Sequence, residues 1–319
     1  MASIRGKLFS AVARAAGNVN PMIVEKKHKN VVKDLRSMEP LFRHFIAPIG
    51  YRFKKAEADG VPVEVFSKKK DGSDNVVLVI HGGAYISRMM FYYRLLNKRY
   101  SKASGGGTVV HFDYRCAPEA IYPAALEDIM KVWRWLLDNG VKPENVLTVG
   151  DSAGGHLSVN LMMKLHDLGM AQPRAAILMS PWLDMTASGH TYVENYKVDP
   201  VFGIKGQTPS PDEVRNMLMT SDLYMWLGDN DRKDPYISPV YAEFDNTYPP
   251  MLVTAGGNEM LLSDSETLVE KLRAVGVNAR LYVAEGMFHV FNIYQLFPES
   301  RRALKEMSRF IRESFGYLA

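Results

Sequence analysis

Residues Val146–His166 read VLTVGDSAGGHLSVNLMMKLH, and this stretch decides the fold. A short apolar run leads into the pentapeptide Gly150–Gly154, a G-x-S-x-G, and a helical pattern follows. A sharp turn from a strand into a helix needs small neighbours and pushes the central hydroxyl, here that of Ser152, out above the sheet. The N-terminus of the following helix favours negative charge at the same place. The pattern predicts a nucleophilic serine; a glycine-rich helix start capped by serine is the structural alternative.

The segments around this turn alternate between short apolar runs and helical patterns. Several runs are continuously apolar, as expected for strands that are covered on both faces of a sheet. The alternation predicts an α/β fold with a doubly wound, mostly parallel sheet, in which Val61–Phe66 has the alternating pattern of an edge strand. The expected strands are Val61–Phe66, Val76–Ile80, Thr108–Phe112, Val146–Gly150, Ala175–Ser180, Met251–Ala255 and Ala279–Ala284, and the expected helices are residues 121–139, 154–168, 263–275 and 298–315.

Two segments interrupt this rhythm. Residues 1–50 have a helical pattern ahead of the first strand, and residues 186–225 are too long for an ordinary connection between two strands. Ligand sites in such sheets open at the carboxyl ends of the strands, so we expect both segments to form a helical lid over that edge. Two unrelated surface insertions are the alternative. The core then comprises residues 51–185 and 226–319.

A glycine pair follows the expected strand Val76–Ile80 in the sequence VVLVIHGGAYISR. Acyl transfer develops negative charge on a carbonyl oxygen, and fixed N–H donors must stabilise that charge. One donor is expected from the residue after the nucleophile, Ala153, and others from a loop after an earlier strand. Gly82 and Gly83 let the backbone approach a substrate closely. This loop therefore predicts an oxyanion hole, with a simple glycine turn as the alternative.

The base for such a serine is expected late in the chain, because enzymes of this architecture carry the nucleophile, the acid and the histidine in that order. His289, in EGMFHVF, follows the expected strand Ala279–Ala284 and would lie in a loop at the carboxyl edge. His81 precedes the serine, so we interpret it as structural. No histidine pair combines metal-ligand spacing with a supporting carboxylate, and we expect no metal site.

Three carboxylates compete for the role of the acid that orients the histidine. They lie in TAGGNEMLLSDSE, residues 254–266, as Glu259, Asp264 and Glu266. Ser263 and Glu266 form the S-x-x-E pattern of a capping box, and Asp264 suits the first turn of the same helix. Glu259 has no such structural role and follows the expected strand Met251–Ala255, so it is the preferred acid; Asp264 is the second choice.

Composition bounds the remaining possibilities. The chain has 319 residues with a net charge of +4, and its short lysine runs lack interleaved aromatic residues, so we expect no nucleic-acid partner. The only cysteine, Cys116, excludes an internal disulfide and fits a reducing compartment, which makes the cytoplasm the expected location. No apolar run reaches about 18 residues, so stable membrane insertion is not expected.

Four blocks of the sequence resemble the bacterial hormone-sensitive-lipase-like carboxylesterases, which have the α/β-hydrolase fold. The resemblance extends over about residues 61–315. It is carried by HGGAY (residues 81–85), by DYRCAPEAIYPAALED (113–128), by GDSAGG (150–155), and by DPYISPVYA (234–242) together with GMFHVF (286–291). Such a set of blocks is far more specific than a single G-x-S-x-G.

The resemblance implies hydrolysis of small-molecule carboxylic esters with short to medium acyl chains, through an acyl-enzyme intermediate and without a metal or organic cofactor. It implies that Ser152 is the nucleophile and His289 the base. Glu259 takes the place of the aspartate in the family's D-x-L-x-D pattern. The family's lid combines N-terminal helices with an insert, as expected above. The resemblance allows a homodimer and does not require one.

The resemblance also implies an oxyanion hole formed by the N–H groups of Gly83, Ala84 and Ala153, in a loop that Gly82 shapes. Two residues depart from the family pattern. Ala84 replaces a third glycine and adds a methyl group, and Arg88 replaces a glycine further along the loop.

Two other functions would use the same residues or the same fold. An amidase, or a deacetylase of acetylated small molecules, would need the same three side chains. A ligand receptor without catalysis is the other alternative, but such proteins lose part of the catalytic set, and here every role has a candidate residue.

Overall fold

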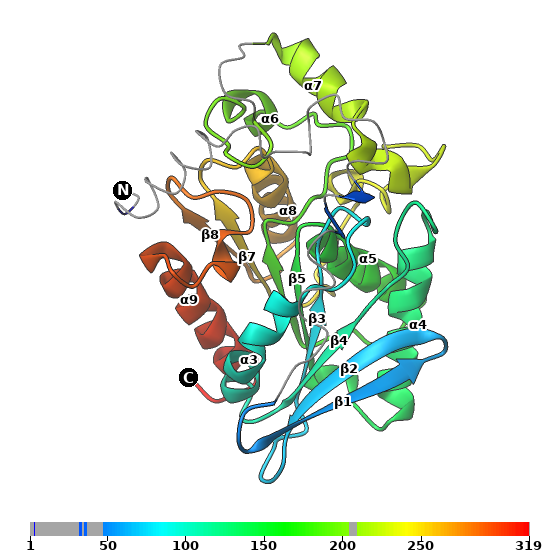
Figure 1. Ribbon diagram of the computed structural model, residues 1–319, viewed down its shortest axis with the longest axis vertical. Helices are drawn as coiled ribbons and strands as arrows, with labels where there is room; N and C mark the ends of the chain where they lie inside the picture. The colour runs from blue at the N-terminus through cyan, green and yellow to red at the C-terminus, as the bar shows by residue number, and fades with distance from the viewer. Residues whose placement is uncertain (1–2, 4–31, 34, 37–46, 204–208, 319) are drawn as a thin grey trace.

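The computed structural model describes residues 3, 32–33, 35–36, 47–203 and 209–318. An eight-stranded sheet with the strand order β1-β2-β4-β3-β5-β6-β7-β8 forms its centre (Figure 1). β1 and β2 form an antiparallel hairpin and β2 pairs antiparallel with β4, whereas the pairs from β4 to β8 are parallel. The predicted α/β class with a mostly parallel sheet is confirmed. The strands are β1 (Tyr51–Ala58), β2 (Val61–Lys68), β3 (Val76–Ile80), β4 (Thr108–Phe112), β5 (Val146–Asp151), β6 (Ala175–Met179), β7 (Met251–Gly256) and β8 (Ala279–Ala284).

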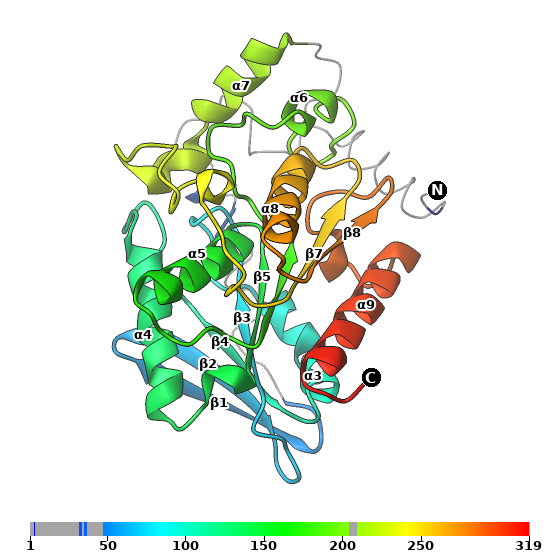
Figure 2. The ribbon, with the colours of Figure 1, turned by 180° about the vertical axis from the view of Figure 1, so that it is seen from behind.

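Helices cover both faces of the sheet, because successive residues of each strand point to opposite sides. In β3, Val77 and Val79 pack in the cluster that contains α3 and α9, and Leu78 and Ile80 pack with α4 and α5. Figures 1 and 2 show the two helix layers from opposite sides. The described helices are α3 (Asn97–Ala103), α4 (Ala124–Asp138), α5 (Ala153–Asp167), α6 (Thr191–Glu194), α7 (Pro211–Met219), α8 (Leu262–Ala274) and α9 (Pro298–Ser314), with 3₁₀ turns η2 (Phe91–Leu96), η3 (Pro143–Asn145), η4 (Asp222–Leu227), η5 (Pro239–Tyr241) and η6 (Phe291–Ile293).

Strand β1 is absent from the sequence-based prediction. It reads YRFKKAEA, and most of its residues are exposed or half-buried, so it carries no apolar run. Because β1 occupies the outer position, β2 is an interior strand and the edge assignment of Val61–Phe66 was wrong. The predicted helical segment 1–50 lies largely outside the described residues.

The insert 186–225 contributes α6, α7 and η4, which lie beyond the carboxyl ends of the central strands, in the upper part of Figure 1. α7 starts after Ser210, which caps it. The Ser210 side chain accepts the N–H of Glu213 at 3.3 Å, and the Glu213 carboxylate accepts the N–H of Ser210 at 2.6 Å. Among the described helices, none is long and apolar enough to span a membrane.

The predicted capping box at the start of α8 was wrong. The helix begins at Leu262 and has no side-chain cap, so Ser263 lies inside its first turn. The hydroxyl groups of Ser263 and of Thr191 in α6 are hydrogen-bonded at 2.7 Å, and Glu266 lies 3.8 Å from His190. Both residues therefore contact the insert and do not form a local cap.

Asp264 lies in the first turn of α8, as predicted, and its side chain also makes contacts outside the helix. Its carboxylate is buried and accepts the N–H groups of Leu183 at 2.7 Å and Asp184 at 3.0 Å, and the hydroxyl of Tyr192 at 3.0 Å. Burial raises the pKa of Asp264 well above its ordinary value, and the nearby Asp184 raises it further. Asp264 thus ties α8 to the loop after β6.

Replacing Asp264 by asparagine tests this interpretation. Asparagine keeps an acceptor for the two N–H groups and mimics the protonated acid. Because the folded-state pKa is raised, the folded protein binds this proton more tightly than the unfolded chain, so the stability that Asp264 contributes falls as pH rises above about 4. Asp264→Asn cannot lose this proton, so its free energy of unfolding minus that of wild type, measured with urea, should be larger at pH 8 than at pH 5. The opposite trend would contradict a raised pKa for the buried Asp264.

Candidate active site

Ser152 occupies the turn between β5 and α5. Its backbone lies at φ 51° and ψ −119°, a region that ordinary residues avoid. A side chain on Gly150 would overlap the carbonyl group of Gly154, and one on Gly154 would overlap the carbonyl oxygen of Ile80. The glycines of the G-x-S-x-G motif are therefore required by the packing of the turn, which presents Ser152 at the carboxyl end of the sheet.

His289 reaches this serine from the loop after β8. Its Nε2 lies 3.0 Å from the Ser152 Oγ. In the tautomer that carries its proton on Nδ1, the imidazole accepts a hydrogen bond from the Ser152 hydroxyl. The next residue, Val290, has a φ of 52°, and its N–H donates to the Ser180 hydroxyl at 3.0 Å. This bond fixes the loop to the end of β6 and thereby the imidazole beside Ser152.

Glu259 lies on the other side of His289, in the loop after β7. Its Oε2 is 3.4 Å from the Nδ1 of His289, and its side chain is fully buried. The two loops are joined by backbone hydrogen bonds from Gly257 to Ala284 and from Asn258 to Met287, both 2.9 Å. The structure therefore brings Ser152, His289 and Glu259 together, whereas the Asp264 carboxylate binds the loop after β6.

The glycine loop after β3 faces the same serine. Gly83 has a φ of 108°, and its carbonyl accepts the N–H groups of Ile86 and Ser87 at 2.9 Å. In the described part of the chain, no hydrogen bond uses the N–H of Gly83 or Ala84, nor that of Ala153 at the start of α5. These three N–H groups thus remain available to an oxyanion.

Gly82 has a different position in this loop. Its N–H donates to the Tyr93 hydroxyl at 2.8 Å and to the Asp151 carboxylate at 3.0 Å, and a side chain here would overlap that carboxylate. Its N–H is therefore already used, which agrees with a residue that shapes the loop.

Ala84 and Tyr85 both adopt left-handed backbone conformations, with φ of 54° and 57°. Such a conformation costs a non-glycine residue about 1–2 kcal/mol, so surrounding contacts must hold it. The Tyr85 ring is buried 4.3 Å from the ring of Trp226, and its hydroxyl donates to His156 Nδ1. The His156 Nε2–H donates to the Ile237 carbonyl at 3.0 Å, which defines the tautomer. The strained loop is thus anchored to α5.

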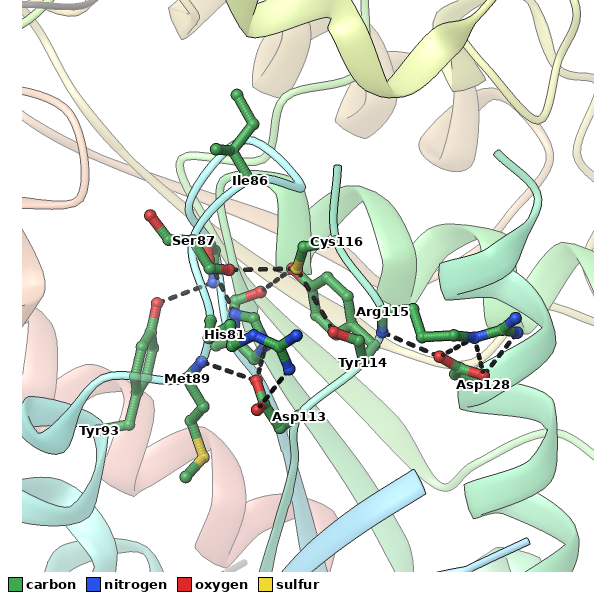
Figure 3. Close-up of polar contacts among 12 residues, drawn as sticks. His81, Ile86, Ser87, Met89, Tyr93, Asp113, Tyr114, Arg115, Cys116 and Asp128 are labelled. Atoms are coloured by element: carbon green, nitrogen blue, oxygen red, sulfur yellow. Dashed lines mark hydrogen bonds and ion pairs between the residues drawn. The ribbon is translucent and has the colours of Figure 1, made fainter. Parts of the chain in front are cut away.

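The loop is also supported from behind (Figure 3). His81 is buried, stacks on Tyr114 at 4.0 Å, and donates from Nδ1 to the Gly82 carbonyl at 2.9 Å. Burial lowers the pKa of His81, so its ring is neutral. Asp113 accepts the N–H of Met89 at 3.0 Å and pairs with Arg88 at 3.4 Å. His81 therefore has a structural position, and Arg88 is accommodated by an ion pair.

Sequence reasoning missed the contribution of Asp151 and Tyr93. Tyr93 of η2 donates to the buried Asp151 carboxylate at 3.1 Å, and both hold the N–H of Gly82. Burial raises the pKa of Asp151 to about 6, against the lowering by the Tyr93 bond and by His289. Asp151 is the variable second residue of the G-x-S-x-G, so the motif alone gave no signal for it.

A cavity of about 200 Å³ opens at Ser152, and its walls are mainly apolar. The insert and the segments next to it supply several large side chains: Trp182, Tyr192, Phe202, Leu218, Leu223 and Tyr224. The 3₁₀ turns and the loop after β8 supply Met90, Tyr92, Ile293 and Tyr294. Searching the described residues finds no group of His, Cys, Asp or Glu that could hold a metal ion.

The chain is similar to several known proteins. The family model described as the alpha/beta hydrolase fold matches residues 77–293. The putative acetyl-hydrolase LipR of Mycobacterium tuberculosis is 31% identical over 269 residues, which cover 83% of this chain and 82% of LipR. An esterase of Acinetobacter venetianus is 30% identical over 244 residues, 76% of each chain.

A solved structure extends the likeness to the whole fold. An esterase from the bacterial hormone-sensitive lipase family superposes with a TM-score of 0.80 at 29% identity, over 99% of this chain and 100% of that one. The chain belongs to the α/β-hydrolase fold family, and within it to the hormone-sensitive-lipase-like carboxylesterases.

Proposed function

We propose that this carboxylic ester hydrolase cleaves small esters with short to medium acyl chains through an acyl-enzyme on Ser152. The observation that carries the proposal is the line of contacts from the Ser152 Oγ to the His289 Nε2, at 3.0 Å, and from the His289 Nδ1 to the Glu259 carboxylate, at 3.4 Å. A nucleophile, a base and an orienting acid in this order are the parts that two-step acyl transfer needs.

In the first step, Ser152 attacks the ester carbonyl while His289 takes the hydroxyl proton. The N–H groups of Gly83, Ala84 and Ala153 stabilise the resulting oxyanion, each by about 3 kcal/mol in comparable sites. His289 then protonates the leaving alcohol, and the acyl group stays on Ser152. In the second step, water that His289 activates releases the acid. Glu259 stabilises the imidazolium in both steps.

The cavity supports the proposed substrate class. Its volume of about 200 Å³ lies below the about 300–1,000 Å³ of pockets for drug-sized ligands, and its walls are mainly apolar. The methyl group of Ala84 lines the cavity and narrows it. We also propose that residues 1–50 and 186–225 together form the lid. The side chains that the insert supplies to the cavity walls support this proposal. A cytoplasmic location is supported by the single, buried Cys116, and the homodimer stays a prediction.

Deacetylation of small molecules is the second candidate function, because LipR, a relative, is named as a putative acetyl-hydrolase. Acetyl esters fit the same cavity and the same mechanism, so this activity would be a preference among esters. No feature of the cavity favours amide over ester substrates, so we do not propose an amidase.

An acyl-chain series tests the substrate class. With p-nitrophenyl esters, kcat/KM should be highest between acetate and octanoate and at least roughly tenfold lower for palmitate, because a long chain cannot enter the cavity. An anilide control should react far more slowly. Ser152→Ala should lower kcat at least about 10⁴-fold while far-UV circular dichroism stays unchanged. Full activity in the purified variant would remove Ser152 from the mechanism.

A pair of matched substitutions tests the choice of acid. Glu259→Gln should lower kcat by about 10²–10⁴-fold, because the neutral amide no longer stabilises the imidazolium. Asp264→Asn makes the same chemical change on a carboxylate that binds the loop after β6, and kcat should stay within about tenfold of wild type. Steady-state kinetics with p-nitrophenyl butyrate measures both. A larger loss in Asp264→Asn than in Glu259→Gln would reverse the assignment.

A further inference from the structure

The fully buried Glu259 carboxylate has no hydrogen-bond partner in the described part of the chain; its near neighbour is the Nδ1 of His289 at 3.4 Å. Glutamate also has one more rotatable bond than aspartate. No hydrogen bond to the side chain therefore selects the conformation that faces His289, so packing around the side chain and the position of the Glu259 backbone have to fix it.

Three polar residues of the insert hold that backbone. Thr191, Asn195 and Asp199 are spaced four residues apart along α6 and the turns that follow it, so they lie on one side of this segment. All three bind the segment from residue 257 to residue 263. The Thr191 hydroxyl donates to the Met260 carbonyl at 2.8 Å and accepts the N–H of Ser263 at 2.9 Å.

Asn195 and Asp199 bind the two ends of one peptide group. The Asn195 side-chain amide donates to the carbonyl oxygen of Glu259 at 2.8 Å. The N–H of Met260, in the same peptide group, donates to the Oδ2 of Asp199 at 2.7 Å. A peptide group held at both its oxygen and its nitrogen cannot rotate, and this fixes the direction in which the Glu259 side chain leaves the backbone.

The same Asp199 carboxylate also acts on the other side of His289. Its Oδ1 accepts the N–H groups of Val201 at 2.7 Å and Phe202 at 3.1 Å, and the Phe202 ring lies 4.8 Å from the His289 ring. Asp199 is only 2% exposed. Burial raises its pKa to about 6, against the lowering by its three N–H donors and by His289, so it is ionised at neutral pH.

We propose that Asp199, together with Asn195, is a positioning residue that holds Glu259 and His289 in their reactive geometry, so that the insert takes part in catalysis as well as covering the site. This inference rests on the roles proposed above for Glu259 and His289. A displacement of about 1 Å in such a group can cost a factor of 10² in rate. Loss of the hydrogen bonds from Asp199 and Asn195 therefore lowers kcat, whereas loss of a segment that only covers the site would change KM.

A double-mutant cycle on kcat tests this inference, with Asp199→Asn, Glu259→Gln and the combined variant. Asparagine keeps the size of Asp199 but replaces one accepting oxygen by a donor, so one set of N–H bonds is lost. Asp199→Asn should lower kcat about 10- to 100-fold with KM within about twofold of wild type. In the Glu259→Gln background the same change should cost less than about threefold, because Glu259 no longer contributes and only the contact of Phe202 with His289 remains to be disturbed.

Glu194→Gln is the matched control, since it makes the same acid-to-amide change on an exposed face of α6. Its kcat should equal that of wild type. Circular dichroism and the melting temperature give the folded fraction, by which every kcat is corrected. If Asp199→Asn does not fold, Asn195→Ala removes the bond at the other end of the same peptide group and should lower kcat about 3- to 10-fold at unchanged KM.

Equal fold losses from Asp199→Asn in both backgrounds, a loss confined to KM, or wild-type kcat would overturn the inference. The cycle separates this result from a failure of the proposed function. If Glu259→Gln alone keeps wild-type kcat, the proposed acid is wrong. If Glu259→Gln is inactive and Asp199→Asn is fully active, only the positioning role of Asp199 is wrong.

Discussion

The strained turn at Ser152 is the constraint on which the rest of the site depends. A backbone at φ 51° costs a serine of the order of 1–3 kcal/mol. Two features hold it there. The Ser152 N–H donates a hydrogen bond to the Met179 carbonyl at 2.9 Å, and Gly150 and Gly154 stand where any side chain would overlap the backbone. The turn sets two things together. It presents the hydroxyl at the carboxyl end of the sheet, and it starts α5 so that the free N–H of Ala153 lies beside it.

Because that hydroxyl has a fixed place, the other strands deliver their loops to it. β3 leads into the glycine loop with Gly82 and Gly83, and β7 and β8 supply Glu259 and His289 in loops joined by backbone hydrogen bonds. The loop after β3 is supported at two points: Asp151 and Tyr93 hold Gly82, and Trp226 and His156 hold Tyr85. Side chains that touch no substrate therefore account for much of the site's geometry.

The central strands could be predicted from sequence because parallel strands covered on both faces read as apolar runs, and β3 and β4 begin and end where the pattern places them. The charged strand β1 could not, since only its pairing with β2 makes it a strand. Ser152 and His289 could be named because a motif and the order of residues in the chain restrict them.

The acid was chosen from sequence by a partly wrong argument. The sequence favours Glu259 for two reasons: it follows a strand, and an S-x-x-E pattern predicts a capping role for Ser263 and Glu266. The second reason is wrong, because Ser263 and Glu266 contact the insert instead. Asp264 and Asp199 form long-range bonds to backbone N–H groups that no local pattern reveals. The tertiary contacts of buried carboxylates such as Asp264 and Asp199 are therefore the part of this site that could not be predicted from the sequence.

Labelling with diethyl p-nitrophenyl phosphate tests the central claim, acyl transfer through Ser152, most directly. The account predicts one diethylphosphoryl group per chain, found by peptide mass spectrometry on Ser152, with esterase activity lost in proportion to labelling. It also predicts that Ser152→Ala takes up no label. Stoichiometric inactivation with the label on another residue, or full labelling of Ser152 with activity retained, would contradict it.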